Sequence, residues 1–139
     1  MIAIDSNIWI YYLDATTEEH ERVRRPMRDA LGVRQLFVNG VIPLEVTHHL
    51  ANRRLDSEQF VREFLDTTDV VVEPVNLKMV RRAEELLQAY PHAGIGGRDA
   101  SLIAAMERRG ISELWTHDGG LKRLDGRLDW LTVHDPVAA

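Results

Sequence analysis

The chain has 139 residues with a formal net charge of −5; 45% of them are hydrophobic and 28% are charged. This length and balance are typical of one globular domain, and we treat residues 1–139 as a single domain. The sequence contains no cysteine, which excludes disulfides, zinc-thiolate sites and thiol nucleophiles.

Hydropathy and charge limit the expected cellular location and the expected binding partners. No apolar stretch approaches the ~18 residues that a membrane span needs, so we expect no membrane contact and a cytoplasmic location. The acidic balance argues against non-specific binding to nucleic acid, which is usually achieved by a basic surface. That argument fails if several acids surround a metal, because bound cations reverse the local charge.

The first half of the chain predicts short strands that alternate with helices. Residues 2–4 are apolar and mostly β-branched, as expected of a buried strand, and Asp5-Ser6-Asn7 can cap the helix that follows. Gly32 is expected to close a charged helix, and Asn39-Gly40 to form a turn. Periodicity and turn residues predict helices over residues 8–13, 18–31, 42–55 and 58–66, with strands over 36–38 and 70–72.

The second half continues the alternation. Asn76 is expected to cap a helix that runs to Tyr90, and Gly110 to stop an alanine-rich helix over residues 98–109. Strands are predicted over residues 113–116 and 131–133. Strands that alternate with helices predict an α/β fold, in which a mainly parallel central sheet of about five strands lies between two helical layers.

Four acids occupy strand ends and helix starts of this predicted fold. Asp5 directly follows the strand predicted over residues 2–4, and Asp118 comes shortly after the strand predicted over residues 113–116. Glu45 and Asp99 lie near the starts of the helices predicted over residues 42–55 and 98–109. In a parallel sheet these positions gather along the carboxyl edge, where ligands bind. Clustered carboxylates repel one another unless a cation is bound, and oxygen ligands favour Mg²⁺ or Mn²⁺. The set therefore predicts a metal site for phosphate chemistry.

Each acid also has a structural explanation when it is taken alone. Asp5 can serve as an N-cap, although Ser6 can also cap. Glu45 can interact with a helix N-terminus, and Asp118 can be a turn residue before Gly119-Gly120. The Thr116 hydroxyl, at a strand end, could position a neighbouring carboxylate or a metal-bound water.

The order of these motifs resembles the PIN domain, and most closely the toxin ribonucleases of the VapC type. The resemblance spans essentially the whole chain. It rests on Ile4-Asp5-Ser6-Asn7, on Glu45 in Pro-Leu-Glu-Val, on Arg98-Asp99-Ala100 followed by Ala104-Ala105, and on Thr116-His117-Asp118.

The resemblance implies a metal-dependent endoribonuclease, the toxin of a toxin–antitoxin pair. Asp5, Glu45, Asp99 and Asp118 would match the acidic quartet of the family, which binds Mg²⁺ or Mn²⁺ and carries out catalysis. Asn7 and Thr116 would match its accessory polar positions. The partners implied are an RNA substrate, a second copy of the chain in a homodimer, and a cognate antitoxin that inserts a segment into the active-site groove.

Two other functions fit the same residues. A PIN-like fold can persist as a catalytically silent module that binds RNA or protein, in which case the acids would not bind metal. An RNA-processing nuclease without an antitoxin would keep the same four acids. The arginines of the two helices on either side of the second strand could contact a phosphate backbone or lie on a solvated face; these are Arg22, Arg24, Arg25, Arg28, Arg53 and Arg54.

Overall fold

The computed structural model describes residues 1–67 and 69–138 and contains a five-stranded sheet. The strand order is β3-β2-β1-β4-β5, and each neighbouring pair is parallel. The strands are β1 (Ile2–Ile4), β2 (Leu36–Asn39), β3 (Val70–Glu73), β4 (Glu113–Trp115) and β5 (Thr132–His134). The predicted parallel α/β sheet is therefore confirmed, and within the described residues the sheet is parallel throughout.

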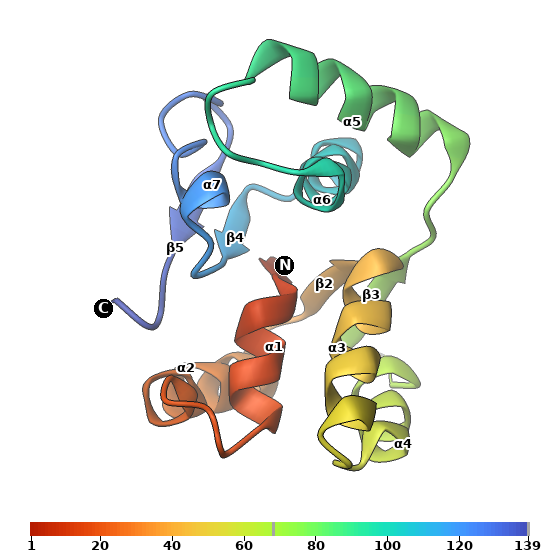
Figure 1. Cartoon of the computed structure of the whole chain (residues 1–139), viewed down its shortest axis with the longest axis vertical. Coiled ribbons are helices and arrows are strands. Elements are labelled where there is room, and N and C mark those ends of the chain that lie inside the picture. The colour runs from red at the N-terminus through yellow and green to blue at the C-terminus, as the bar shows by residue number, and fades with distance from the viewer. Residues whose placement is uncertain (68, 139) are drawn as a thin grey trace.

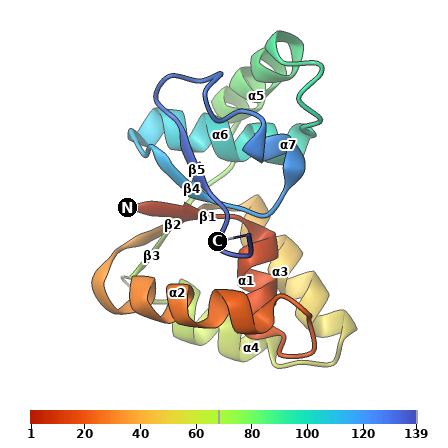
Figure 2. The ribbon, with the colours of Figure 1, turned by 90° about the vertical axis from the view of Figure 1, so that its left-hand side faces the viewer.

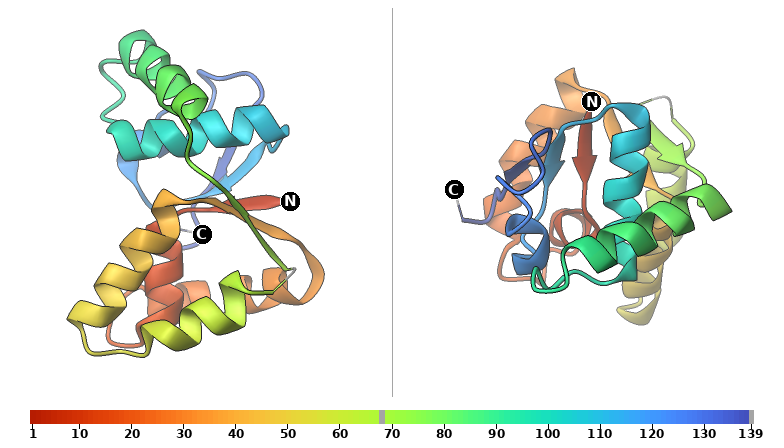
Figure 3. Two further views of the ribbon diagram at one scale, coloured as in Figure 1. Left: turned by 90° about the vertical axis from the view of Figure 1, so that its right-hand side faces the viewer. Right: turned by 90° about the horizontal axis from the view of Figure 1, so that it is seen from above.

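Helices cover both faces of the sheet, which confirms the three-layer prediction (Figures 1 and 2). One layer holds α1 to α4, and α6 lies against the opposite face with α5 packed outside it (Figure 3). The helices are α1 (Ser6–Leu13), α2 (His20–Val33), α3 (Val41–Asn52), α4 (Ser57–Phe60), α5 (Leu77–Ala89), α6 (Gly97–Arg109) and α7 (Gly119–Lys122). No helix in the described part of the chain is long and apolar enough to cross a bilayer.

The core forms around the central strand β1. Every residue of β1 is buried, because helices cover both of its faces and strands flank both of its edges. Eight consecutive residues of α6, from Asp99 to Met106, are buried, since this helix lies between the sheet and α5. The small side chains of Ala100, Ala104 and Ala105 allow that close packing.

The start of α1, the end of α2 and the presence of α7 differ from the predictions. Helix α1 begins at Ser6 rather than Ile8, because Asp5 is its N-cap and accepts the Ser6 N–H at 2.8 Å. Helix α2 runs through Gly32 to Val33, so the expected stop at Gly32 is wrong. The short helix α7 was not predicted, and it begins where Asp118 accepts the Leu121 N–H at 3.0 Å.

The predicted helix over residues 58–66 is only partly α-helical. Helix α4 passes into a π-helical turn, η1 (Val61–Leu65), in which the Asp66 N–H donates to the Val61 carbonyl at 2.9 Å. Phe60 and Phe64 both lie edge-on to Trp9, with ring centroids 5.7 and 5.4 Å away. These ring contacts attach the segment to α1.

Candidate active site

The carboxyl ends of β1 and β4 lie side by side and bring two predicted site segments together. β1 pairs with β4 in the register Ile4 to Trp115, and the Asp5 N–H donates to the Trp115 carbonyl at 3.0 Å. Asp5 follows β1 directly, and Thr116 follows β4. α1 and α7 begin at this edge of the sheet (Figure 2).

Thr116 connects Asp5 to the Asp118 backbone. Its hydroxyl donates to Asp5 Oδ2 at 2.7 Å and accepts the Asp118 N–H at 3.0 Å. Thr116 is fully buried and Asp5 is 4% exposed, so these bonds form away from bulk water. The Thr116 hydroxyl thus contacts a neighbouring carboxylate, and a role for it in positioning that carboxylate or a metal-bound water stays a prediction.

Asp99 and Glu45 approach the same edge from α6 and α3. Asp99 is buried in the first turn of α6 and accepts the Gly96 N–H at 3.2 Å. Arg98 forms an ion pair with Glu45 through Nη1 and Oε2, and its Nε lies 3.9 Å from Asp99 Oδ1. The second oxygen of Glu45, Oε1, is buried and has no hydrogen-bond partner among the residues that the structure describes.

The acids influence one another electrostatically. Burial raises the pKa of Asp5, and the charge of Asp99 raises it further. Burial raises the pKa of Glu45 despite the nearby Arg98, and Asp5 adds to the rise. Burial also raises the pKa of Asp99, and Asp118 contributes. The four predicted acids are thus close enough to repel one another when ionised.

The donor chemistry of this cluster fits a hard divalent cation. It offers carboxylate oxygens, which Mg²⁺ and Mn²⁺ prefer, and the buried Oε1 of Glu45 is an acceptor without a donor. Within residues 1–67 and 69–138, no three acidic or histidine side chains are arranged to hold an ion as they stand. Glu45 is instead turned toward Arg98.

A second polar network lies beside Asp118, and sequence reasoning missed most of it. Asp135 Oδ2 lies 2.8 Å from His117 Nδ1 and accepts a bond from Lys122 Nζ at 2.6 Å. Although burial opposes it, these two bonds hold the pKa of Asp135 below its usual value. Asn7 Oδ1 accepts the His117 N–H at 3.4 Å, which connects α1 to this loop.

Asn39 is another residue whose role the sequence did not reveal. It was expected in a turn, but it ends β2 and is fully buried. Its Nδ2 donates to Ser101 Oγ at 2.9 Å, and Ser101 Oγ donates to the Arg98 carbonyl at 2.6 Å. These bonds attach the first turn of α6 to the carboxyl end of β2. An asparagine that directly continues the apolar run Leu36-Phe37-Val38 is the sequence signal that could have indicated this role, because a polar side chain at a buried strand end needs a partner.

The glycines after Asp118 permit a close backbone approach. A Cβ on Gly120 would lie 2.5 Å from the Gly94 carbonyl oxygen, so a side chain there would force the two segments apart. Arg123 Nη1 donates to the Ala93 carbonyl at 2.8 Å and joins the same two segments. The loop before α6 is therefore held against α7.

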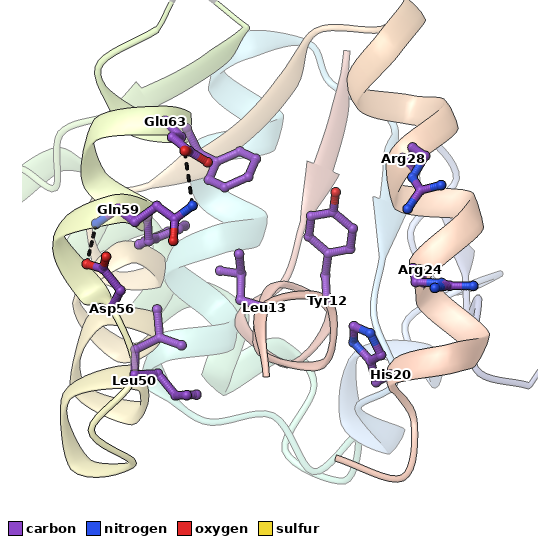
Figure 4. Close-up of a pocket in the computed structure, with 12 residues that line it drawn as sticks. Tyr12, Leu13, His20, Arg24, Arg28, Leu50, Asp56, Gln59 and Glu63 are labelled. Carbon is purple, nitrogen blue, oxygen red and sulfur yellow. Dashed lines mark hydrogen bonds between the residues drawn. The ribbon is translucent and has the colours of Figure 1, made fainter. Parts of the chain in front are cut away.

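A groove of about 540 Å³ lies in the layer of α1 to α4 (Figure 4). Side chains from α2 form one wall, and Figure 4 shows Asp56, Gln59 and Glu63 on the opposite side. Its apolar lining is Tyr12, Leu13, Leu50, Leu55, Phe60 and Phe64, and its basic lining is His20, Arg24 and Arg28. Apolar residues between walls of opposite charge are suited to an amphipathic segment.

The arginines expected either on a solvated face or at RNA have varied partners. Arg24 lies 3.4 Å from Glu21, and Arg25 lies 4.0 Å from Asp29, both on the surface of α2. Arg22 donates to the Val137 carbonyl at 3.2 Å. Arg53 Nε lies 3.8 Å from Asp14, which also contacts His49. Contact of these arginines with RNA stays a prediction.

The sequence matches the PIN domain family over residues 2–127. The chain belongs to the PIN domain family. No sequence among the curated proteins matches it. The family match covers β1, β4 and all four acids of the cluster, so the resemblance drawn from the motifs is confirmed at the level of the family.

Solved structures with the same PIN fold include toxins and toxin–antitoxin complexes. The Mycobacterium tuberculosis toxin VapC20, which cleaves the sarcin-ricin loop, is 21% identical over 88% of this chain and 93% of its own, with a TM-score of 0.75. FitAcB from Neisseria gonorrhoeae is 16% identical over 98% of both chains (TM-score 0.70). A toxin–antitoxin complex from Klebsiella pneumoniae is 18% identical over 98% of both chains (TM-score 0.67). At these identities the likeness establishes the fold.

Proposed function

We propose that this PIN domain protein is a Mg²⁺- or Mn²⁺-dependent endoribonuclease and the toxin of a toxin–antitoxin pair. The observation that carries the proposal is the cluster of mutually repelling carboxylates, Asp5, Glu45, Asp99 and Asp118, at the carboxyl edge of a parallel sheet. Membership of the PIN family and a fold shared with VapC toxins support the choice of nuclease over other phosphate chemistry.

In the proposed reaction, Asp5 and Asp99 are the principal metal ligands, and Glu45 and Asp118 complete the site or order the attacking water. A bound divalent ion supplies charge neutralisation for the phosphate and a more acidic water. Hydrolysis joins the water oxygen to phosphorus, breaks one P–O bond of the RNA and leaves a proton on the departing oxygen.

The surrounding residues hold these ligands in place. Thr116 fixes one oxygen of Asp5, and the Ser6 N–H fixes the other at 2.8 Å. Because both oxygens are hydrogen-bonded, the carboxylate has one orientation before any ion binds, which lowers the entropy lost on binding. Asn7 supports the same region through the His117 backbone.

The substitution Asp5→Asn tests the proposal. It keeps the shape of the side chain and removes the charge, so we expect a folded protein that no longer cleaves RNA in Mg²⁺ or Mn²⁺. The variant should remain folded without metal, because relief of the burial penalty on the Asp5 charge offsets the loss of one acceptor for the Ser6 N–H or the Thr116 hydroxyl. Cleavage of a labelled RNA, with and without EDTA, and circular dichroism are the measurements.

Wild-type cleavage by purified Asp5→Asn would contradict the nuclease assignment at this site. Absence of EDTA-sensitive cleavage and of Mn²⁺ binding in the wild type would favour the catalytically silent module. If the wild type cleaves RNA and no antitoxin is encoded beside it, the function as an RNA-processing nuclease would be favoured.

We also propose that the groove shown in Figure 4, which is lined by none of the four acids, receives a second segment of the antitoxin besides the one expected at the active site. Aromatic and aliphatic side chains line it, and the basic side chains of α2 form one wall, so the expected segment is amphipathic, with acids on the face toward α2. The binding partner to test is the small protein encoded beside this one.

Two neighbouring arginines of α2 provide a matched test of the groove. Arg24 lines it, whereas Arg25 is on the same helix but does not line it and is 91% exposed. We expect Arg24→Glu to weaken antitoxin binding by about tenfold and Arg25→Glu to change it by less than about threefold, measured by calorimetry. Equal effects of the two charge reversals would exclude this groove.

A further inference from the structure

Arg98 occupies a position that the catalytic proposal does not explain. It lies in the first turn of α6, directly before Asp99, and its side chain is half-exposed. The guanidinium forms an ion pair with Glu45 from α3 and lies 3.9 Å from Asp99. One positive group therefore bridges two of the proposed metal ligands, which come from different helices.

The charge of Arg98 acts on two carboxylates of the cluster. Its guanidinium contacts Glu45 and its Nε lies 3.9 Å from Asp99 Oδ1, so it offsets the repulsion between the acids at this edge. A divalent ion at the same carboxylates would also offset that repulsion, and the two cations would therefore compete for the same oxygens.

The pairing of Glu45 is incomplete. Arg98 contacts Oε2, while Oε1 is buried and forms no geometrically complete hydrogen bond within the described residues, with the Ser6 hydroxyl as its neighbouring donor group. A buried carboxylate oxygen without a donor is costly, so the Arg98 pair does not satisfy Glu45 fully. A cation that also contacts Oε1 would therefore satisfy Glu45 more fully than the guanidinium does.

The backbone of Arg98 is held by hydrogen bonds, while its side chain is half-exposed. The Arg98 carbonyl accepts the Ser101 hydroxyl at 2.6 Å, and Ser101 is held by Asn39. The guanidinium, by contrast, is at the surface. A change of side-chain rotamer alone would release Glu45 and Asp99, and it needs no movement of α6.

We propose that Arg98 competes with the divalent ion for Glu45 and Asp99, and that the displaced guanidinium binds a phosphate of the RNA. A guanidinium presents a planar set of donors that pairs equally well with a carboxylate or with a phosphate. The same side chain would then neutralise the acids before metal binds and hold the substrate afterwards. This inference rests on the proposed metal-dependent nuclease function.

The substitution Arg98→Gln removes the charge and separates the two roles. We expect Mn²⁺ to bind about three- to tenfold more tightly, because the competing cation is gone. Binding of a short labelled RNA in Ca²⁺ should weaken by about the same factor, because one phosphate contact is lost. A merely structural residue would weaken both, and an uninvolved one would change neither.

Two further variants complete the experiment. Arg98→Lys keeps the charge and should return the Mn²⁺ affinity toward the wild-type value. Arg82→Gln is the control, since Arg82 forms ion pairs with Glu85 and Glu107 at 2.8 and 2.9 Å and lies outside the cluster. Mn²⁺ binding is measured on the full chain by the electron paramagnetic resonance signal of the free ion, and folding by thermal melts.

Asp5→Asn distinguishes failure of this inference from failure of the proposed function. If Asp5→Asn loses Mn²⁺ binding while Arg98→Gln binds it no more tightly than the wild type, competition by Arg98 is wrong and the metal site stands. If Asp5→Asn binds Mn²⁺ as the wild type does, or if no variant binds it, the proposed site is wrong and this inference fails with it. Unchanged RNA affinity in Arg98→Gln would overturn the phosphate role.

Discussion

At the residue scale, one acid can both cap a helix and serve the proposed metal site. Asp5 caps α1 through Oδ1 while Oδ2 accepts the Thr116 hydroxyl. Asp118 caps α7 through one oxygen, and its backbone N–H donates to Thr116. Capping fixes the orientation of a carboxylate, and a ligand with a fixed orientation loses less entropy when it binds an ion. The structural role therefore serves the proposed site.

Thr116 is the residue on which this orientation depends. We expect Thr116→Val to lower RNA cleavage by about 10- to 100-fold, because Asp5 Oδ2 loses its donor. The free energy of unfolding should fall by about 1–2 kcal/mol, since the part-buried Asp118 N–H loses its acceptor. Steady-state cleavage and urea unfolding are the measurements.

Two variants control for the loss of a threonine as such. Thr116→Ser keeps the hydroxyl and should retain most activity. Thr132→Val removes a hydroxyl from an exposed position of β5 and should leave cleavage unchanged. Full activity in Thr116→Val would show that this hydrogen bond does not position the ligand.

At the element scale, hydrogen bonds of the buried Asp14 carboxylate join the end of α1 to α3. Asp14 is the C-cap of α1 and is fully buried. Thr16 donates to its Oδ1 through N–H and hydroxyl, and His49 Nε2 lies 2.8 Å from Oδ2. His49 reaches Asp14 because α3 runs beside α1.

The Asp14 pair predicts a pH dependence of stability. Although burial opposes it, bonds from Thr16 and His49 lower the pKa of Asp14 from 3.8 to about 2. Because the folded pKa is depressed, the stabilisation is present above pH ~4 and is lost as pH falls toward ~2. We expect Asp14→Asn to lower the free energy of unfolding by about 2 kcal/mol at pH 7, and by much less near pH ~2.

Asp29 offers the matched control for Asp14. Its side chain is 71% exposed and lies 4.0 Å from Arg25, so Asp29→Asn should change stability by less than about 0.5 kcal/mol at either pH. Urea unfolding of the three proteins at both pH values gives the comparison. Equal stability of Asp14→Asn and wild type at pH 7 would refute the predicted contribution.

At the scale of the whole molecule, the exposed apolar surface is concentrated near β3 and α5. β3 is an edge strand of the sheet, and α5 is the outermost helix on its side (Figure 1). Exposed apolar residues follow one another along this part of the chain: Val72, Val75, Leu77 and Val80. Exposed apolar side chains on an edge strand and an outer helix are typical of protein interfaces, and we propose that these residues belong to the expected homodimer interface.

The substitution Leu77→Glu tests the dimer. Leu77 is 62% exposed in this structure, so a charge there should leave the fold of one chain intact and separate the dimer into monomers. Val33→Glu is the control, because Val33 is 83% exposed at the end of α2 and outside this surface. Light scattering with size exclusion reports the mass. A monomeric wild type, or a dimeric Leu77→Glu, would contradict this interface.

The amino-acid sequence by itself determined the alternation of strands and helices, because each element is encoded by local periodicity and by caps that act over a few residues. It therefore predicted the parallel three-layer fold and placed the four acids at strand ends and helix starts. The tertiary structure decided the contacts between elements that are distant in sequence. The Thr116 bond to Asp5, the Asn39 bond to Ser101 and the Arg98 pair with Glu45 each connect different elements. No local pattern encodes such pairs, since they depend on which strand ends and helix starts the sheet brings together.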